Sequence, residues 1–286
     1  MDEPTGLHRL SGATRTVGVM GWPVAHSLSP VIHNAAFVAL ALDWVYVPLP
    51  VHPEQLSVAL VGLGALRFAG ANVTMPHKTA VADLIDDLSD DARRLRAVNT
   101  IVSDGQFLRG ENTDAPGFDR FLRRDAAFDP SGCSALIFGA GGAARACALA
   151  LARGGAESLT VAAREPARVA DLAAAVDGLG TTVRAIAFDE AADVGAELVV
   201  NATPLGAREE LLPIPRIGPD ALVIDLLYQP VVTPLQTQAR AVGALVFGGL
   251  GLLLHQAALS FELWTGQQPP LEVMSAAALT ALADRV

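Results

Sequence analysis

The segment Ala135-Leu136-Ile137-Phe138-Gly139-Ala140-Gly141-Gly142-Ala143-Ala144 decides the fold of this chain. Four apolar residues predict a short buried strand, the glycines predict a tight turn, and the alanines that follow predict a helix. A GxGxxA turn in this context is typical of dinucleotide binding, because glycine lets the backbone approach a pyrophosphate at the helix N-terminus. A purely structural turn is the alternative. We predict that the cofactor contacts Gly139, Ala140, Gly141, Gly142 and Ala143.

Downstream of this turn, strands and helices alternate. Such alternation predicts parallel βαβ units with helices on both faces, that is, a Rossmann-like doubly wound sheet. A composition shift after Phe128-Asp129-Pro130 marks where this region begins. Two helices are predicted to end the chain, one from about Leu250 to Trp264 and one after Pro269-Pro270. The strands of the region are predicted at 135–138, 158–163, 183–187, 198–201, 222–225 and 245–247.

The segment Ala163-Arg164-Glu165-Pro166-Ala167-Arg168 ends the second of these strands and bears on the choice of nucleotide. An acidic residue here would accept the ribose hydroxyls of NAD, whereas arginine favours the 2′-phosphate of NADP. Arg164 and Arg168 favour NADP, while Glu165 would repel a phosphate. Two solvated arginines at the start of a helix are the structural alternative. We predict NADP as the cofactor, with NAD as the alternative.

The N-terminal half also alternates strands and helices, which predicts a second α/β domain. Helices are predicted after Ser29, with Ser29 as a candidate N-cap, after Pro53, and from Lys78 onward. Leu84, Ile85, Leu88, Ala92 and Leu95 recur at helical spacing with acids on the opposite face, which predicts a helix there. The strands are predicted at 16–20, 45–50, 71–75 and 97–102.

Within this half, Asn72-Val73-Thr74-Met75-Pro76-His77-Lys78 places polar side chains at the end of a strand. Pro76 cannot continue a sheet ladder, so the chain must turn and present Asn72, Thr74 and Lys78. Amide, hydroxyl and ammonium together can hold a polyhydroxylated substrate and deliver a proton to it. A strand-to-helix turn with a solvated lysine is the alternative.

Another pair of hydroxyls lies in His26-Ser27-Leu28-Ser29-Pro30, ahead of a predicted helix. Both hydroxyls and the helix N-terminus could hold a carboxylate, although a simple N-cap role for Ser29 is the alternative. Asn201-Ala202-Thr203-Pro204 is predicted to be a strand-end loop over the cofactor. Tyr228 is either a packed loop aromatic or a hydroxyl that reaches the substrate.

Composition excludes several classes. The 286 residues predict two domains, and 51% hydrophobic with 17% charged residues predicts packed cores. A net charge of −10 argues against nucleic acid as the main partner. Cys133 and Cys147 lack metal or disulfide spacing, and no histidine lies in an HExxH pattern, so no metal site is predicted. The acidic start lacks a signal-peptide core and the apolar run 242–254 is too short to span a bilayer, so we predict a cytoplasmic protein.

Several motifs, in this order from about residue 16 to 280, resemble the shikimate dehydrogenase family, which includes shikimate and quinate dehydrogenases. They are Gly21-Trp22-Pro23 with His26-Ser27-Leu28-Ser29-Pro30 and His33-Asn34, Asn72 to Lys78, Ala97-Val98-Asn99-Thr100, Asn112-Thr113-Asp114, the turn from Gly139 to Arg145, Asn201 to Pro204, and Gly251 to Gln256.

The resemblance implies a substrate domain of residues 1–114 plus 250–286 and an NADP-binding domain of residues 115–249, with substrate in the cleft between them. It implies Lys78 and Asp114 as catalytic residues and carboxylate binding by Ser27 and Ser29. Further substrate contacts are implied for Thr74, Asn99 and Gln256, with Asn72 nearby and Tyr228 as an addition, and further cofactor contacts for Thr203 and Gly249.

The activity implied is the reversible NADPH-dependent reduction of 3-dehydroshikimate to shikimate in aromatic amino acid biosynthesis. An NAD-dependent quinate/shikimate dehydrogenase is the nearest alternative, because Ala163 and Glu165 replace the Asn and Thr usual in NADP-selective members. The Ser27/Ser29 pair favours shikimate over quinate. A non-catalytic metabolite sensor and an aminoshikimate-type enzyme are further alternatives. We predict a monomer or homodimer that binds neither membranes nor nucleic acid.

Overall fold

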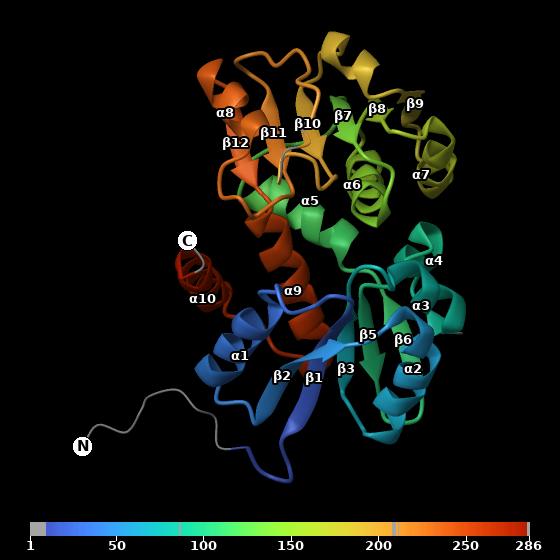
Figure 1. The fold of residues 1–286 in the computed structure, drawn as a ribbon, viewed down its shortest axis with the longest axis vertical. Helices are drawn as coiled ribbons and strands as arrows, with labels where there is room; N and C mark the ends of the chain where they lie inside the picture. The colour runs from blue at the N-terminus through green and yellow to red at the C-terminus, as the bar shows by residue number, and fades with distance from the viewer. Residues whose placement is uncertain (1–9, 86, 208–209, 211, 285–286) are drawn as a thin grey trace, which may run out of the picture. The chain divides into compact units, whose positions relative to one another are not determined.

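The structure is a computed structural model that describes residues 10–85, 87–207, 210 and 212–284 (Figure 1). Its contacts divide the chain into two compact units. Unit 1 runs to Thr113 and resumes at Gln256, and unit 2 comprises Asp114–His255. The family resemblance implies domain boundaries after residues 114 and 249, so the two divisions differ at Asp114 and at residues 250–255. The helix α9 (Leu250–Thr265) therefore contributes residues to both units.

Unit 2 contains the predicted parallel sheet, with strand order β12-β11-β10-β7-β8-β9. The chain proceeds from β7 to β8 and β9, and then crosses to β10 on the other side of β7. This reversal creates a topological switch point at the carboxyl ends of β7 and β10, where ligands of such sheets bind. The strands are β7 (Ser134–Phe138), β8 (Ser158–Ala162), β9 (Thr182–Ile186), β10 (Leu198–Asn201), β11 (Leu222–Asp225) and β12 (Leu245–Gly248).

Helices cover both faces of this sheet, as predicted. Because side chains alternate along a strand, Ala135 and Ile137 pack into one core while Leu136 and Phe138 pack into the other. The first core also contains residues of α5 (Asp114–Arg124), α6 (Gly142–Arg153) and α7 (Val169–Val176), and the second contains residues of the 3-10 turn η3 (Asp189–Asp193) and α8 (Pro234–Ala241). A further 3-10 turn, η2 (Pro166–Arg168), precedes α7.

Unit 1 contains a mixed sheet with strand order β2-β1-β3-β5-β6-β4. β1 pairs in parallel with β2 and β3, whereas β5 is antiparallel to both β3 and β6. The strands are β1 (Arg15–Gly21), β2 (Trp44–Pro50), β3 (Gly70–Val73), β4 (Asp87–Leu88), β5 (Thr100–Ser103) and β6 (Leu108–Glu111).

Two layers of helices cover the sheet of unit 1. One core is formed with α2 (Leu56–Ala65, after η1, Pro53–Gln55), α3 (Lys78–Leu84) and α4 (Asp90–Leu95). On the other side, α1 (Ser29–Ala39) and the last turns of α9 contribute to an aromatic cluster, and α10 (Leu271–Ala283) packs against α1. In it, Phe37 stacks on Phe261 with ring centroids 5.3 Å apart, and Tyr46 lies 6.0 Å from Trp264.

The helix predicted from the spacing of Leu84, Ile85, Leu88, Ala92 and Leu95 is wrong as a continuous element. α3 ends at Leu84, Asp87–Leu88 pair with β6, and Ser89 then caps α4 by accepting the N–H of Ala92 at 3.3 Å. These apolar residues are nevertheless buried as predicted. Ile85, after α3, and Ala92, in α4, pack into the same core although they belong to separate elements.

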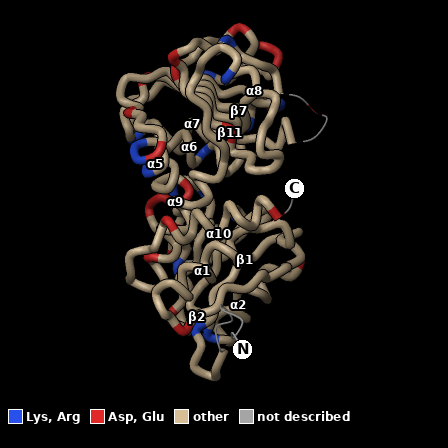
Figure 2. Tube along the Cα trace, turned by 90° about the vertical axis from the view of Figure 1, so that its left-hand side faces the viewer, with Lys and Arg blue, Asp and Glu red and all other residues tan. Residues whose placement is uncertain are grey.

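Charged residues of both signs are interspersed along each unit (Figure 2). Basic residues gather on α5, where Arg123 pairs with Asp119 at 2.9 Å and with Asp129 at 3.3 Å. Among the described residues, no helix has both the length and the apolarity needed to cross a membrane.

Candidate active site

The predicted substrate residues of unit 1 lie along one edge of its sheet. β1 and β3 run in parallel and end together, since Met20 pairs with Val73. β5 begins at that same edge, because Asn72 pairs with Thr100. The loops that follow β1 and β3 touch each other, with the Trp22 N–H donating to the Met75 carbonyl at 3.1 Å. The register therefore brings the segments 22–28, 74–78 and 99–100 to a common edge.

Lys78 is the first residue of α3, directly after the turn that ends β3. Its carbonyl accepts the Val98 N–H at 2.9 Å, and the buried ring of His77 bonds the Val51 carbonyl at 2.8 Å, so the turn is held from two sides. Lys78 is the only lysine in the sequence, in which every other long basic side chain is arginine. Because a guanidinium does not release its proton in proteins, Lys78 is the one long basic side chain of the sequence that can both carry charge and transfer a proton.

The two serines after β1 differ from the N-cap arrangement. α1 begins at Ser29, and the N-cap position is Leu28, which has helical angles (φ −87°, ψ −12°) and no side-chain cap. The prediction of Ser29 as an N-cap is therefore wrong. Instead, the Ser27 hydroxyl accepts the Ser29 N–H at 3.2 Å. Both hydroxyls lie at the start of α1, where a carboxylate would be favoured.

Asn72 is engaged within the protein at both ends of its amide. Its Oδ1 accepts the Tyr46 hydroxyl at 2.8 Å, and burial raises the pKa of that phenol, which keeps it a donor. Its Nδ2 donates to the Asn99 carbonyl at 3.1 Å and to the hydroxyls of Thr100 and Ser260, both at 3.0 Å. Asn72 therefore supports its neighbours, and its role toward the substrate stays a prediction.

Asn99 and Gln256 lie far apart in the sequence and meet in the structure. Asn99 Oδ1 accepts the backbone N–H of Thr113 at 2.7 Å. Its Nδ2 donates to Thr113 Oγ1 at 2.8 Å and, more weakly, to Gln256 Oε1 at 3.4 Å. Asn99 and Gln256, two of the predicted substrate-binding residues, are thus hydrogen-bonded to each other.

Sequence reasoning missed the hydroxyl groups that hold these amides, namely those of Tyr46, Thr100, Thr113 and Ser260. Two signals were available in the sequence. Tyr46 is a polar side chain inside the apolar strand WVYVPLP, and Ser260 lies four residues after Gln256, hence on the same helix face.

Asp114 and Tyr228 belong to unit 2, together with the cofactor residues. Asp114 is the first residue of α5 and is buried, and Tyr228 follows β11. Their roles toward substrate, like the assignments of Ser27, Thr74 and Lys78, stay predictions.

The glycine turn of unit 2 leaves room for a phosphate group. Gly139 has φ +104°, and a Cβ there would lie 3.0 Å from Thr203 Cγ2 and 3.2 Å from the Ala202 carbonyl. By contrast, a Cβ added at Gly141 or Gly142 would meet nothing within 4 Å. Gly141 is the N-cap of α6, and no side chain caps that helix. The helix start is therefore open to a ligand, and these residues fit the pyrophosphate of a dinucleotide.

The neighbouring loop is fixed by a buried network at the ends of β10 and β11. Asn201 accepts the N–H and the hydroxyl of Thr203 at 3.0 and 2.7 Å, and it donates to Asp225 at 3.0 Å. Asp225 also accepts the Thr233 hydroxyl at 2.7 Å. Because Thr203 contacts Gly139, this network positions the loop beside the glycine turn. The predicted cofactor residue Gly249 packs against the backbone of Leu226.

The buried carboxyl of Asp225 should make stability depend on pH. Burial raises the pKa of Asp225, and its hydrogen bonds from Thr233, Leu227 and Asn201 oppose this rise only in part. The folded state thus binds this proton more tightly than the unfolded state, so its contribution is present below about pH 3.9 and is lost as pH rises through the folded pKa. Relative to Asp225→Asn, the wild type should therefore lose unfolding free energy as pH rises from about 3.9 through the folded pKa of Asp225.

Urea unfolding of both proteins across that range measures this difference. Asp220→Asn is the matched control, because Asp220 is exposed before the amino end of β11 and should show no such trend. Parallel pH profiles for the wild type and Asp225→Asn would contradict the prediction.

The residues predicted to select the nucleotide are exposed and partly paired. Arg168 Nε lies 3.4 Å from Glu165 Oε2, and the two side chains are 73% and 69% exposed. Arg164 is also exposed. Toward a 2′-phosphate at this predicted position, Glu165 would act in two ways, by its own negative charge and by pairing with Arg168.

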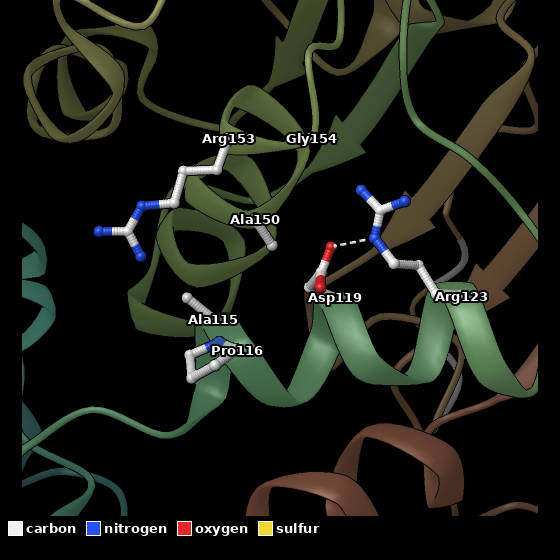
Figure 3. A pocket seen from close by; sticks show the side chains of 7 residues that line it. All are labelled: Ala115, Pro116, Asp119, Arg123, Ala150, Arg153 and Gly154. Atoms are coloured by element: carbon white, nitrogen blue, oxygen red, sulfur yellow. Dashed lines mark hydrogen bonds and ion pairs between the residues drawn. The ribbon is translucent and has the colours of Figure 1, made fainter.

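Among the described residues, three hollows contain none of the predicted site residues. One, of about 280 Å³, lies between α5 and α6, where Asp119 faces Arg123 and Arg153 extends away from them (Figure 3). Another, of about 730 Å³, is a largely apolar groove beside α2.

Cys133 and Cys147 are buried and form no disulfide with each other. No group of three His, Cys, Asp or Glu side chains within the described ranges is arranged to hold a metal ion.

Three family models match the chain. The shikimate dehydrogenase substrate binding domain matches residues 19–101, and the shikimate 5′-dehydrogenase C-terminal domain matches residues 249–279. A model described as NADP oxidoreductase, coenzyme F420-dependent, matches residues 135–229, which lie within unit 2.

Relatives resemble nearly the whole chain. Shikimate dehydrogenase (NADP(+)) of Geobacter metallireducens is 44% identical, with 96% of this chain and 99% of the relative covered. A solved shikimate dehydrogenase in complex with NADP+ is 35% identical with a TM-score of 0.88, covering 98% of this chain and 99% of its own. Quinate dehydrogenase of Corynebacterium glutamicum, solved with NAD, is 31% identical with a TM-score of 0.85, covering 93% and 99%. This chain belongs to the shikimate dehydrogenase family.

Proposed function

We propose that this chain catalyses the reversible NADPH-dependent reduction of 3-dehydroshikimate to shikimate, a step of the shikimate pathway to aromatic amino acids. The observation that carries the proposal is the resemblance of nearly its whole length to enzymes named shikimate dehydrogenase (NADP(+)). The lone lysine after β3 supports it, because this reduction needs a cation that can also give up a proton.

Binding of the substrate is assigned to unit 1. The hydroxyls of Ser27 and Ser29 at the start of α1 are proposed to hold the carboxylate. Thr74, Asn99 and Gln256 are proposed to hydrogen-bond the ring hydroxyls, since hydroxyls and amides can both donate and accept.

Bound NADPH supplies the hydride to the ketone carbon. Negative charge then develops on the ketone oxygen, and the Lys78 ammonium stabilises that charge and donates the proton. In the reverse direction the Lys78 amine accepts the proton of the alcohol. Asp114 is proposed as the second catalytic residue. Gly139–Ala143, Thr203, Gly249 and the two arginines 164 and 168 are proposed to hold the cofactor, with the open N-terminus of α6 as the phosphate site.

A kinetic comparison of four substrate–cofactor pairs tests the proposal. Oxidation of shikimate or quinate with NADP+ or NAD+ is followed through nicotinamide absorbance. We expect the highest kcat/KM for shikimate with NADP+. Highest kcat/KM for quinate with NAD+ would instead identify a quinate dehydrogenase, and binding of shikimate without turnover would identify a metabolite sensor.

One observation favours the NAD-dependent alternative, namely the pair between Glu165 and Arg168. If Glu165 hinders NADP, then Glu165→Thr should raise kcat/KM for NADP+ about fivefold, because exposed charge pairs contribute up to about 1 kcal/mol and 1.4 kcal/mol is tenfold. The gain should shrink at high salt, since exposed charges are screened. Steady-state kinetics at two ionic strengths measure both effects.

Glu157→Thr is the matched control for this prediction. Glu157 is exposed before the amino end of β8, whereas Glu165 follows the carboxyl end of the same strand. The control should leave kcat/KM for NADP+ unchanged. An equal gain in both variants would show a general effect of net charge instead of a local one.

The predicted cytoplasmic location and the predicted monomer or homodimer remain part of the proposal. Cell fractionation and light scattering test them.

A further inference from the structure

Four hydrogen-bond contacts meet at the hydroxyl of Ser260, which has no exposed surface. Ser260 Oγ donates to the Gln256 carbonyl one turn earlier on α9 at 3.0 Å. It accepts Asn72 Nδ2 at 3.0 Å, and it pairs with Thr100 Oγ1 at 2.8 Å and with Thr113 Oγ1 at 3.3 Å. One hydroxyl thus joins α9 to β3, to β5 and to the segment after β6.

The directions of the surrounding hydrogen bonds follow from backbone groups, which cannot exchange roles. The N–H of Thr113 can only donate, so Asn99 turns its Oδ1 toward it and its Nδ2 toward Gln256. Gln256 must then accept through Oε1 and turn its amide nitrogen away from Asn99. The carbonyl of Asn99 can only accept, which in the same way fixes Asn72 with its Nδ2 toward Asn99 and Ser260.

We propose that Ser260 is a positioning residue for the substrate: its hydroxyl ties α9 to the strand ends so that Gln256 presents an amide N–H to a substrate oxygen. Gln256 and Ser260 lie on one face of α9, one turn apart, so a shift of the helix at Ser260 moves Gln256 directly. The inference rests on the proposed function, since it presumes that Gln256 binds a hydroxylated substrate.

A merely structural role would look different. The only important hydrogen bond of Ser260 would then be the one it donates to the carbonyl four residues earlier. Thr265 on the same helix makes such a bond by donating to the Phe261 carbonyl at 2.8 Å. Such a bond would affect the stability of α9 and leave substrate binding unchanged. The hydrogen bonds of the Thr265 hydroxyl join it to Phe261 and Gln267 instead of to the amides of the site, so Thr265→Val is the matched control.

The test is a double-mutant cycle of Ser260→Ala and Gln256→Ala in the full chain, with shikimate and NADP+ as substrates. We expect Ser260→Ala to raise KM for shikimate about tenfold with kcat within about twofold, as for loss of one well-placed hydrogen bond. In the Gln256→Ala background the same change should alter KM by less than about twofold. Thr265→Val should leave KM for shikimate unchanged.

Two results would overturn the inference. One is an unchanged KM in Ser260→Ala, and the other is an equal increase in KM with and without Gln256. Ser260→Cys keeps nearly the same volume with a much weaker hydrogen-bonding group, so it replaces Ser260→Ala if that variant does not fold. Failure of the proposed function is distinguishable, because the wild type would then fail to oxidise shikimate with NADP+.

Discussion

Replacing Lys78 with alanine is expected to lower kcat for shikimate oxidation about 10³-fold, within the range of a general acid–base residue, and to leave KM nearly unchanged. The reason is that its ammonium acts on charge that develops only in the transition state. Lys78→Arg should lose most of the activity as well, because a guanidinium keeps the charge and cannot transfer the proton. Steady-state kinetics with shikimate and NADP+ measure both variants.

Lys78 being the sole lysine allows an independent chemical test. The amines that an acylating reagent can convert to stable amides are this side chain and the α-amino group of the chain. Acylation should therefore inactivate the wild type, and saturating shikimate should protect it. Thr79→Ala, at the next and exposed position of α3, is the control that should retain full activity. Near wild-type turnover by Lys78→Ala would end the assignment.

Gly141→Val is expected to raise KM for NADP+ about 100-fold or more while the protein stays folded. A Cβ at Gly141 meets no atom of the protein within 4 Å, and its φ of −78° suits any residue, so folding should tolerate the change. The added side chain would occupy the space where a pyrophosphate must approach the helix N-terminus. Loss of that charged contact is expected to cost at least about 2.7 kcal/mol, or 100-fold.

Titration of NADP+ binding and thermal unfolding together measure this effect. Gly218→Val is the matched control: a Cβ there also meets nothing within 4 Å, and Gly218 precedes β11 at the amino edge of the same sheet. It should leave NADP+ affinity unchanged. Unaltered NADP+ binding by Gly141→Val would remove the glycine turn from the cofactor site.

Local features of the sequence sufficed to predict unit 2. Its strands are short apolar runs bounded by glycine or polar residues. The glycine turn at 139–142 also predicts a strand before it and a helix after it. The start of α1 was harder. Ser29 and Pro30 both favour helix starts, but Leu28 adopts helical angles and takes the N-cap position, so the Ser29 hydroxyl does not cap the helix.

Long-range contacts could not be read from the sequence. The bond between Asn72 and Ser260 joins residues 188 positions apart, and no local pattern marks either residue as its partner. The same holds for the break between α3 and α4. The apolar spacing of Ile85 and Ala92 predicts that both are buried in one core. It does not predict that the chain between them is extended, with Asp87 paired to Arg109 of β6.

Unit 1 is built from two separate segments of the chain, which has a consequence for its folding during translation. Its aromatic layer joins Phe37 and Tyr46 to Phe261 and Trp264, yet all of unit 2 is translated between these two sets of residues. At about 5–20 residues per second, the nascent N-terminal segment waits on the order of ten seconds before its covering helices leave the ribosome. During that interval the apolar surface around Phe37 and Tyr46 is exposed to chaperones and to non-native contacts. Unit 1 is complete only when the last part of the chain has been synthesised.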